Sequence, residues 1–521
     1  MKSKTLLGMS SALCLGALSL AAQETTELEQ LKRQLQEIQR KFEQTAREQR
    51  QQIEALEQQI KGLKNPQAPA PNATSTTVPV PAPVPTNAEA DTSRWKPSDP
   101  IRIGDQKKAY LDIGLVGSFV AGASSANDIA GGTQLGGHDP NQNGFTVQGI
   151  EANFSGAVDP YFRGNANLLF GVDADSETFT EVEEAWLETV SLPWNLKLRG
   201  GQMFTEFGRL NPTHVHSWDF VDVPLVNGRF LGADGQRNPG GFISWLTPTP
   251  FYSELFLSVQ NSSGVTASSF RAPEAGEGGH HHGAESEVPF GYRHPDNDRG
   301  VNSFSDLLLT PRYVVSFDLT DTQTLVLGGS AAFGPNNVGA EGDTRTEIYG
   351  ADLTWKWTSP KQTGGFPFVK WQSEVMWRNI DAGAFDWDED ADGLVSEGEI
   401  EDLDTGLPAV MAAETLNDFG FYTQLVYGFR KGWSAGVRYD WLDRDDGAYE
   451  LRNLAFEGKQ LGRDPLRDAR WRVSPALTWY PTEFSKLRLQ YNYDDRRDIG
   501  VDHSVWFQFE FILGAHAAHK F

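Results

Sequence analysis

Hydrophobic and polar residues alternate with a period of two over most of the chain beyond residue 108. The clearest example is the segment at 502–513, DHSVWFQFEFIL. Large apolar side chains occupy one face and polar ones the other, as is typical of a strand between lipid and a polar interior. A soluble β-sandwich fits this single segment equally well. The interpretation therefore depends on whether other strands repeat the pattern. The first face holds Val505, Phe507, Phe509, Phe511 and Leu513, and the second holds Ser504, Trp506, Gln508 and Glu510.

Alternating segments bounded by turn residues do repeat along the chain, which predicts about sixteen strands. An even number is typical of single-chain outer-membrane barrels. The predicted strands are 109–120, 144–156, 161–173, 180–190, 195–205, 239–248, 250–260, 306–317, 323–333, 345–358, 366–380, 416–429, 432–443, 469–480, 485–494 and 502–514.

The connections between these strands alternate between short and long. Short turns at one rim and long loops at the other are typical of outer-membrane barrels, in which the short turns face the periplasm. Nothing in a soluble sandwich separates loop lengths in this way. The short turns lie at 158–160, 192–193, 249–250, 319–322, 359–365, 430–432 and 481–484, and the long loops at 121–143, 206–238, 261–305, 381–415 and 444–468.

Arginine and lysine occupy the polar faces of the predicted strands, so we expect them to point inward. A charge facing lipid near the midplane would cost ~2–4 kcal/mol. About sixteen strands leave an aqueous channel. The predicted fold is all-β, a transmembrane antiparallel up-and-down β-barrel in which strand 502–514 pairs with 109–120. A short N-terminal α-helical coiled coil precedes it.

The N-terminal hundred residues have a different composition. Residues 1–22 are predicted to be a secretory signal peptide, with Lys2 and Lys4 before an apolar core. Residues 23–64 carry apolar residues at heptad spacing, which predicts a self-associating periplasmic coiled coil. Residues 65–100 form a Pro-rich linker, and 101–521 the barrel. The only cysteine, Cys14, lies in the signal peptide, so we expect no disulfide in the mature protein.

Charge and composition exclude several classes of function. The net charge of -25 argues against nucleic acid as a partner, because binding phosphate requires a basic surface. No downstream stretch approaches the ~20 consecutive apolar residues of a transmembrane helix. The sequence has no GxSxG or HExxH motif, so we do not expect an enzyme.

With its signal, coiled coil, Pro-rich spacer, strand number and C-terminal Phe521, the chain resembles the phosphate-selective porin O/P-like family of outer-membrane porins. The stretch EEAWLETVSLPWNLKLRGGQMFTEFGRLNP (183–212) is similar to that family's strand–turn–strand before a constriction loop. The ending FILGAHAAHKF resembles a subgroup labelled zinc-regulated outer-membrane receptors. Unlike energy-coupled receptors, however, the chain has no plug domain before the barrel. The resemblance implies location in the Gram-negative outer membrane and assembly by the barrel-assembly machinery.

Loop 206–238 is expected to fold inward and narrow the pore, as it does in porins of similar layout. An acidic loop facing a basic wall would set up a transverse field that favours polar solutes. The alternative is that these charges only solvate the lumen. The loop candidates are Glu206, Arg209, His214, His216, Asp219, Asp222 and Arg229, and the wall candidates are Lys197, Arg199, Arg438, Arg470, Arg472, Lys486 and Arg488.

The segment 388–399 matches a twelve-residue calcium loop. Carboxylates at positions 1, 3 and 5 and a glutamate at position 12 supply oxygen ligands, and glycine at position 6 allows the sharp turn. No flanking helices are predicted, so we expect bound Ca²⁺ to order an external loop; the alternative is a solvated acidic loop. The predicted ligands are Asp388, Asp390, Asp392, Leu394, Ser396 and Glu399.

A second metal-binding candidate is the GGHHHGAE run in the loop 261–305. His280, His281, His282 and Glu285 would capture Zn²⁺ weakly, because contiguous histidines cannot all bind one ion well. The alternative is a flexible polar loop. His516 and His519 are a further, weaker candidate.

Three functions are compatible with these patterns. The favoured one is a passive, homotrimeric diffusion channel for small hydrophilic or ionic solutes, with metal-binding external loops. The second is a receptor that captures zinc or calcium without an energy-coupled plug. The third is a tether in which the barrel only anchors the coiled coil.

Overall fold

The structure is a computed structural model that describes residues 101–514, apart from 106–108, 158, 174–175, 268, 271–287, 295–299, 341 and 389. The predicted signal peptide, coiled coil and linker therefore lie outside the described residues, as do the run His280–His282 with Glu285 and the C-terminal residues 515–521.

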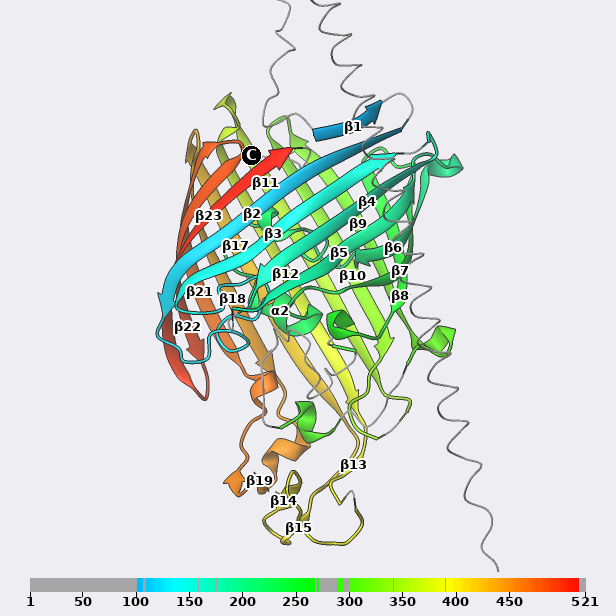
Figure 1. The fold of residues 1–521 in the computed structure, drawn as a ribbon, viewed down its shortest axis with the longest axis vertical. Helices are drawn as coiled ribbons and strands as arrows, with labels where there is room; N and C mark the ends of the chain where they lie inside the picture. Colours follow the sequence, from blue (N-terminus) through cyan, green and yellow to red (C-terminus); the bar gives the residue numbers. More distant parts are fainter. Residues whose placement is uncertain are drawn as a thin grey trace, which may run out of the picture. The chain divides into compact units, whose positions relative to one another are not determined.

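Sixteen antiparallel strands form a closed barrel (Figure 1). Each predicted strand has a counterpart whose ends lie within five residues of the predicted ones, so the prediction is confirmed. The barrel strands are β2 (Ala109–Ser124), β3 (Gly144–Ala157), β4 (Phe162–Val172), β5 (Thr178–Thr189), β6 (Leu196–Phe204), β7 (Arg237–Leu246), β8 (Tyr252–Asn261), β9 (Leu307–Thr320), β10 (Gln323–Pro335), β11 (Arg345–Thr363), β12 (Phe366–Ala382), β17 (Glu414–Arg430), β18 (Trp433–Arg444), β21 (Arg470–Thr482), β22 (Ser485–Arg496) and β23 (Gly500–Gly514).

The first and last barrel strands pair and close the sheet, as predicted. Their register runs from Gly114 opposite Gly514 to Ser124 opposite Ser504. The short strand β1 (Ile101–Asp105) was not predicted. It pairs with residues 109–113 of β2, beyond the end of β23. Closure leaves no open sheet edge along the paired lengths, which is what a sheet in lipid requires.

The two faces of the wall have opposite character. On β23, Phe507 and Phe509 are 46% and 41% exposed, whereas Gln508 and Glu510 are fully buried. The same alternation recurs on β22, where exposed Leu489 is followed by buried Gln490. An apolar exterior around a polar interior is the arrangement of a transmembrane barrel. Among the described residues, no helix has the length and apolar character needed to cross a bilayer.

The long connections all lie at one rim of the barrel and the other rim carries only short turns, as predicted. One rim, here called the short-turn rim, carries connections such as 247–251, 364–365 and 431–432. The long-loop rim carries 125–143, 205–236, 262–306, 383–413 and 445–469, together with shorter connections at 173–177, 336–344 and 497–499.

Parts of the long loops form a lobe with its own hydrophobic core at the long-loop rim (Figure 1). Trp387, Ile400 and Tyr449 are among the buried residues of this lobe. Two small sheets, ordered β13-β16 and β15-β14-β19-β20, complete it. Their strands are β13 (Phe385–Asp386), β14 (Ile400–Asp402), β15 (Leu407–Pro408), β16 (Val410–Met411), β19 (Leu454–Phe456) and β20 (Lys459–Gln460).

Two of the long connections, 125–143 and 205–236, fold back into the barrel; we call them the first and second interior loops. The second contains the helix α2 (Leu225–Leu231), whose apolar residues pack against β12, β17 and β18. Inward folding was predicted for the second loop but not for the first. The 3-10 helices are η1 (Pro193–Asn195), η2 (Val215–Ser217), η3 (Val265–Ala267), η4 (Phe290–Tyr292), η5 (Phe304–Asp306), η6 (Ala448–Leu451) and η7 (Pro465–Arg467).

A charge placed on the outer wall should destabilise the barrel according to its depth. Leu489 lies midway along β22 with its side chain facing out, and Leu246 ends β7 at the short-turn rim. We expect Leu489→Arg to lower the free energy of unfolding by ~2–4 kcal/mol and Leu246→Arg by only ~0–1 kcal/mol. Equilibrium unfolding in denaturant, from lipid vesicles, measures both. Equal effects would contradict the membrane placement of the wall.

Candidate functional site

The second interior loop crosses the barrel and is held at several points on the wall. At its start, Glu374 on β12 accepts hydrogen bonds from the backbone N–H groups of Arg209 (3.0 Å) and Leu210 (2.9 Å). Gly208 N–H donates to the hydroxyl of Ser330 on β10. Because β6, from which the loop leaves, is not a neighbour of these strands, the loop has reached across the interior.

The most strongly paired point of the loop is Asp222. Its Oδ1 accepts from Arg438 Nη2 (2.7 Å), and its Oδ2 accepts from Arg472 Nη1 (3.0 Å). The amide nitrogens of Gln490 and Asn492 each donate to the same carboxylate at 2.8 Å. All of these groups are almost completely buried. A buried carboxylate with this many charge-assisted hydrogen bonds fixes the loop in position.

Other basic residues of the wall hold backbone carbonyls of the interior loops. Arg470 donates to the carbonyls of Gly132 (2.7 Å) and Thr133 (2.9 Å) in the first loop. Arg488 donates to Trp218 O (2.7 Å), and Lys486 Nζ donates to His216 O (3.0 Å). Arg229 of the second loop in turn donates to Leu466 O at 3.0 Å.

Asp139 joins the two interior loops to each other. Its carboxylate accepts from the N–H of Gly136 in its own loop and from the N–H of Val223 in the second loop, each at 2.8 Å. Burial raises the pKa of Asp139 to about 7, and the neighbouring charge of Asp222 adds to the shift.

A smaller group of interior charges remains accessible to solvent. Lys370 Nζ and Asp219 Oδ2 form a 2.7 Å ion pair whose side chains are 26% and 19% exposed. Arg199 pairs with Glu188 and lies over the Trp186 ring at 4.0 Å. Lys197 and Glu206 are partly exposed, and Arg209 is exposed.

The predicted loop and wall residues therefore divide into two sets. Arg438, Arg472 and Asp222 are in direct contact, so no open gap separates their charges. A field across an aqueous gap can arise only from the accessible set described above.

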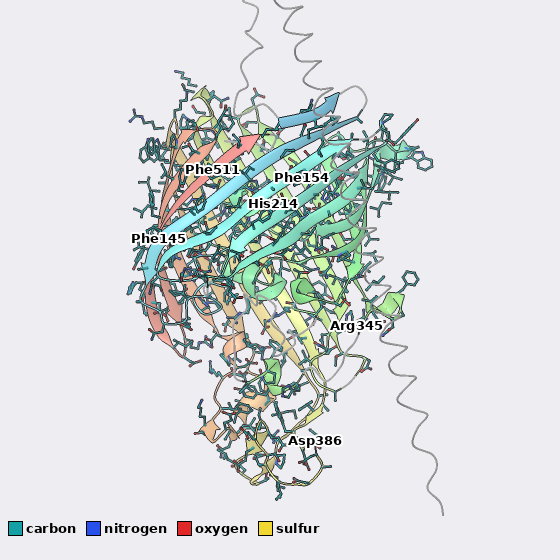
Figure 2. All side chains as sticks on the ribbon, in the orientation of Figure 1. Phe145, Phe154, His214, Arg345, Asp386 and Phe511 are labelled. Atoms are coloured by element: carbon teal, nitrogen blue, oxygen red, sulfur yellow. The ribbon has the colours of Figure 1, made fainter. Side chains whose placement is uncertain are left out.

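His214 anchors the second interior loop to β5. Its Nδ1 lies 3.0 Å from Glu183 Oε2, and its Nε2 lies 3.0 Å from Glu184 Oε2. Burial disfavours the charged ring, but the neighbouring carboxylates of Glu183, Glu184 and Glu151 outweigh it and raise the pKa of His214 well above its usual range. Figure 2 labels His214 within the barrel.

Several important residues were missed by the sequence analysis. Glu374 and Asp440, which accepts from Leu225 N–H at the start of α2, lie at ordinary inward positions of their strands. Glu151 lies on β3. The available signal was a carboxylate at an inward position of a predicted strand; Asp440 also has a basic neighbour on the same face, Arg438, whose Nε donates to it at 2.7 Å.

The predicted calcium loop lies on the long-loop lobe, which Figure 2 marks with Asp386. Buried Trp387 and Ile400 fix its two ends in the core of the lobe. Carboxylate oxygens of Asp388, Asp390 and Asp392 lie within 4.8 Å of one another. The Glu399 carboxylate accepts from Ser396 N–H at 2.8 Å.

No family profile matches the chain. A curated relative from Aquifex aeolicus (strain VF5), described as an uncharacterized protein, is 29% identical over 408 residues, covering 74% of this chain and 73% of that protein. The anion-selective porin from Comamonas acidovorans has a TM-score of 0.43 at 7% identity, over 78% of this chain and 100% of that chain. The outer membrane channel DcaP of Acinetobacter baumannii has a TM-score of 0.44 at 10% identity, over 79% and 99%. This chain's own closed sheet, apolar exterior and charged interior define a transmembrane β-barrel of the outer-membrane type.

Removing the charge of Asp222 should destabilise the interior far more than removing that of Asp219. Asp222→Asn leaves two buried guanidinium groups without their shared carboxylate, so we expect a loss on the order of 3 kcal/mol. Asp219→Asn breaks a partly exposed pair and should cost about 1 kcal/mol or less. Chemical unfolding measures both values, and limited proteolysis of intact barrels reports release of residues 205–236. Similar losses for the two variants would contradict the anchoring role of Asp222.

Proposed function

We propose that the protein is a porin-type outer-membrane channel for the passive diffusion of small hydrophilic or ionic solutes. The observation that carries this proposal is the wide closed barrel with a charged interior, into which the second interior loop folds from the long-loop rim. A barrel of about sixteen strands is too wide for wall side chains alone to fill. The interior loops occupy part of that space and would set the aperture.

The accessible interior charges support passage of water and polar solutes. Lys197, Arg199 and Lys370 are partly exposed within a barrel whose outer face is apolar. Lys356 on β11 is also partly exposed on the inward side. Hydrated charges along the lumen lower the barrier for polar solutes and raise it for apolar ones.

Lys197 and Lys356 form no ion pair among the described residues, although Glu206 interacts with the charge of Lys197 and Asp219 with that of Lys356. Arg199 and Lys370 are each paired with a carboxylate. We propose that the two unpaired lysines favour anions over cations at this level of the channel.

Planar-bilayer recordings test both parts of this proposal. We expect ohmic conductance from the folded protein. Lys197→Glu and Lys356→Glu should each change the anion-to-cation permeability ratio by roughly twofold or more toward cations, measured as a reversal potential in a salt gradient. Lys431→Glu, in an exposed turn at the short-turn rim, is the control and should shift it less. Absence of conductance would exclude the channel, and unchanged selectivity would exclude the role of the lysines.

We also propose that residues 388–399 bind Ca²⁺ and thereby order the lobe. Backbone N–H groups already turn toward the carboxylates, with Leu394 N–H donating to Asp392 Oδ1 at 2.7 Å. Gly393 adopts a positive φ of 71°, the sharp turn that position 6 of such a loop requires.

Calcium binding should depend on the carboxylates at positions 3 and 5. We expect Asp390→Asn together with Asp392→Asn to weaken Ca²⁺ binding by at least roughly tenfold, because two hard oxygen charges are lost. Calorimetry measures the affinity, and Tb³⁺ luminescence sensitised by the adjacent Trp387 reports the site directly. Asp404→Asn, elsewhere on the same lobe, should change neither signal. Undiminished binding by the double variant would place the ion elsewhere.

Two further proposals rest on sequence alone. Residues 23–64 would associate three chains through their heptad seam, and His280–His282 with Glu285 would bind Zn²⁺ weakly.

A further inference from the structure

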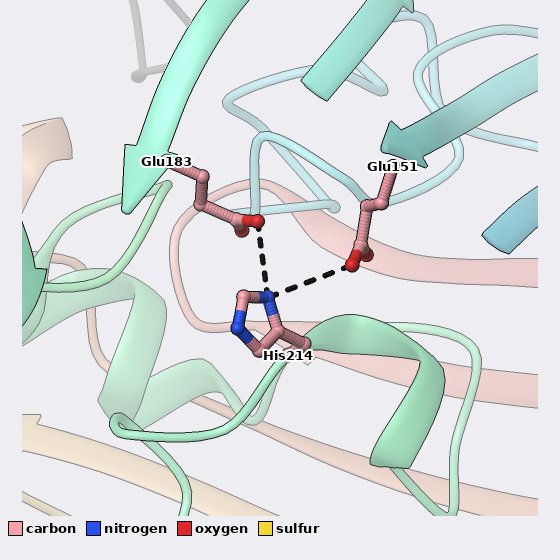
Figure 3. A group of neighbouring side chains, drawn as sticks. All are labelled: Glu151, Glu183 and His214. Carbon is pink, nitrogen blue, oxygen red and sulfur yellow. Dashed lines mark hydrogen bonds and ion pairs between the residues drawn. The ribbon is translucent and has the colours of Figure 1, made fainter. Parts of the chain in front are cut away.

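A group of metal-ligating side chains lies inside the barrel where β3, β5 and the second interior loop meet (Figure 3). Glu151 comes from β3, Glu183 from β5, and His214 from the residue before η2. His214 Nδ1 lies 3.0 Å from Glu183 Oε2 and 3.6 Å from Glu151 Oε2. One ligand atom from each of the three side chains lies within 4.8 Å of the other two.

Further imidazole and carboxylate groups surround these three residues. His216 Nδ1 lies 3.3 Å from Glu151 Oε2, and Glu184 Oε2 lies 3.0 Å from His214 Nε2. Asn167 Nδ2 donates to Glu183 Oε2 at 2.6 Å. The site thus combines imidazole nitrogens with carboxylate oxygens, the donor mixture that suits Zn²⁺, Co²⁺ or Ni²⁺.

The burial of these carboxylates calls for positive charge. Glu151, Glu183 and Glu184 are all less than a tenth exposed. The guanidinium of Arg237 approaches Glu183 no closer than 3.9 Å, while its Nη2 is engaged with Glu181. Buried like charges are costly unless a cation lies among them. The His214 ring, 3.0 Å from both Glu183 and Glu184, supplies one positive charge, and a divalent ion would supply two at one point.

His138, from the first interior loop, independently points to a ligand. It is 7% exposed, and its Nε2 has no hydrogen-bond partner among the described residues. That nitrogen lies 3.9 Å from Glu183 Oε1. On the other side of the ring, Nδ1 lies 3.2 Å from the carbonyl oxygen of Gln148. A proton on Nδ1 donated to this carbonyl leaves the Nε2 lone pair free, which is how metal-binding histidines are oriented.

There is also room beside these groups. His138 and Glu183 line a small pocket in which about 30 Å³ is open to the centre of a water-sized group. Asn227 also lines it, and its side-chain amide has no hydrogen-bond partner among the described residues. A pocket with unpartnered polar groups is one that ions or ordered water fill.

The backbone of β5 is distorted where it presents Glu183. Asn167 on β4 pairs with Glu184, but the next pair joins Leu168 to Val182, so Glu183 is an extra residue without a partner. As a result both Glu183 and Glu184 are buried on the inner side, which breaks the alternation. Such bulges re-aim a side chain at the expense of ladder hydrogen bonds and are common beside functional sites.

We propose that Glu151, Glu183, His214 and His138 bind a divalent transition-metal ion of the Zn²⁺ type inside the barrel. His216, Glu184 and Asn167 orient these ligands. The ion joins both interior loops to the wall formed by β3 and β5. The proposal does not rest on conduction, because binding is measured without transport.

Co²⁺ is the spectroscopic probe, with Zn²⁺ as competitor. The starting protein is the full-length chain with His280→Gln, His281→Gln and His282→Gln, so that the histidine run cannot bind the probe. It is stripped of metal with a chelator and then titrated with Co²⁺ in detergent. We expect Co²⁺ to give ligand-field absorption bands that Zn²⁺ abolishes. Glu183→Gln and His214→Gln should lose these bands, and His503→Gln, an exposed residue on β23, should keep them.

His138→Gln is the second test, in case the other two variants disturb folding. It should weaken Zn²⁺ binding by at least roughly tenfold, as loss of a ligand does, while heat-modifiable electrophoretic mobility shows that the barrel is intact. The proposal is overturned if the starting protein gives no ligand-field bands. It is also overturned if folded His214→Gln, Glu183→Gln and His138→Gln proteins bind like the parent. A protein that conducts but gives no ligand-field bands would exclude the metal site and not the channel. A protein that binds Co²⁺ but does not conduct would exclude the channel and not the metal site.

Discussion

The structure depends on the constraint that charged side chains of the wall must face inward, because lipid surrounds the other face. A charge on the lipid side would cost ~2–4 kcal/mol near the midplane. Arg438, Arg472 and Arg488 are therefore all on the inner face, and each is almost completely buried. Buried guanidinium groups need acceptors. The interior loops supply them through Asp222 and through backbone carbonyls such as Trp218 O.

This pairing explains why the first interior loop, and not the second alone, folds into the barrel. The first interior loop presents the carbonyls of Gly132 and Thr133 to Arg470, and the carboxylate of Asp139 to the second loop. The second loop adds an apolar core through α2, which packs against wall residues such as Met376 and Tyr422. The interior is therefore a folded layer of its own, and beside it charges such as Lys197 and Lys356 stay partly exposed.

The two candidate metal sites differ in how they are built. Asp388, Asp390 and Asp392 belong to one exposed loop whose local turns bring the carboxylates together. Such a site can be predicted from the spacing of residues in the sequence, because its ligands are neighbours along the chain. Glu151, Glu183 and His214 are brought together only by strand pairing, a bulge and the path of an interior loop. No spacing rule connects them.

The sequence by itself determined the barrel: strand positions, alternation of faces, separation of loop lengths and pairing of 502–514 with the first strand all follow from period-two patterning and turn residues. It also indicated that Asp222 and Arg472 lie inside, since each is an interior-loop or inward-strand residue. Only the tertiary structure decided that these two are in contact, that the first long loop enters the barrel, and that Glu183 turns inward against the alternation. The physical reason is that face assignment is local, set by the pleat of one strand. Which loop carboxylate meets which wall cation is set by the path of the loop across the interior.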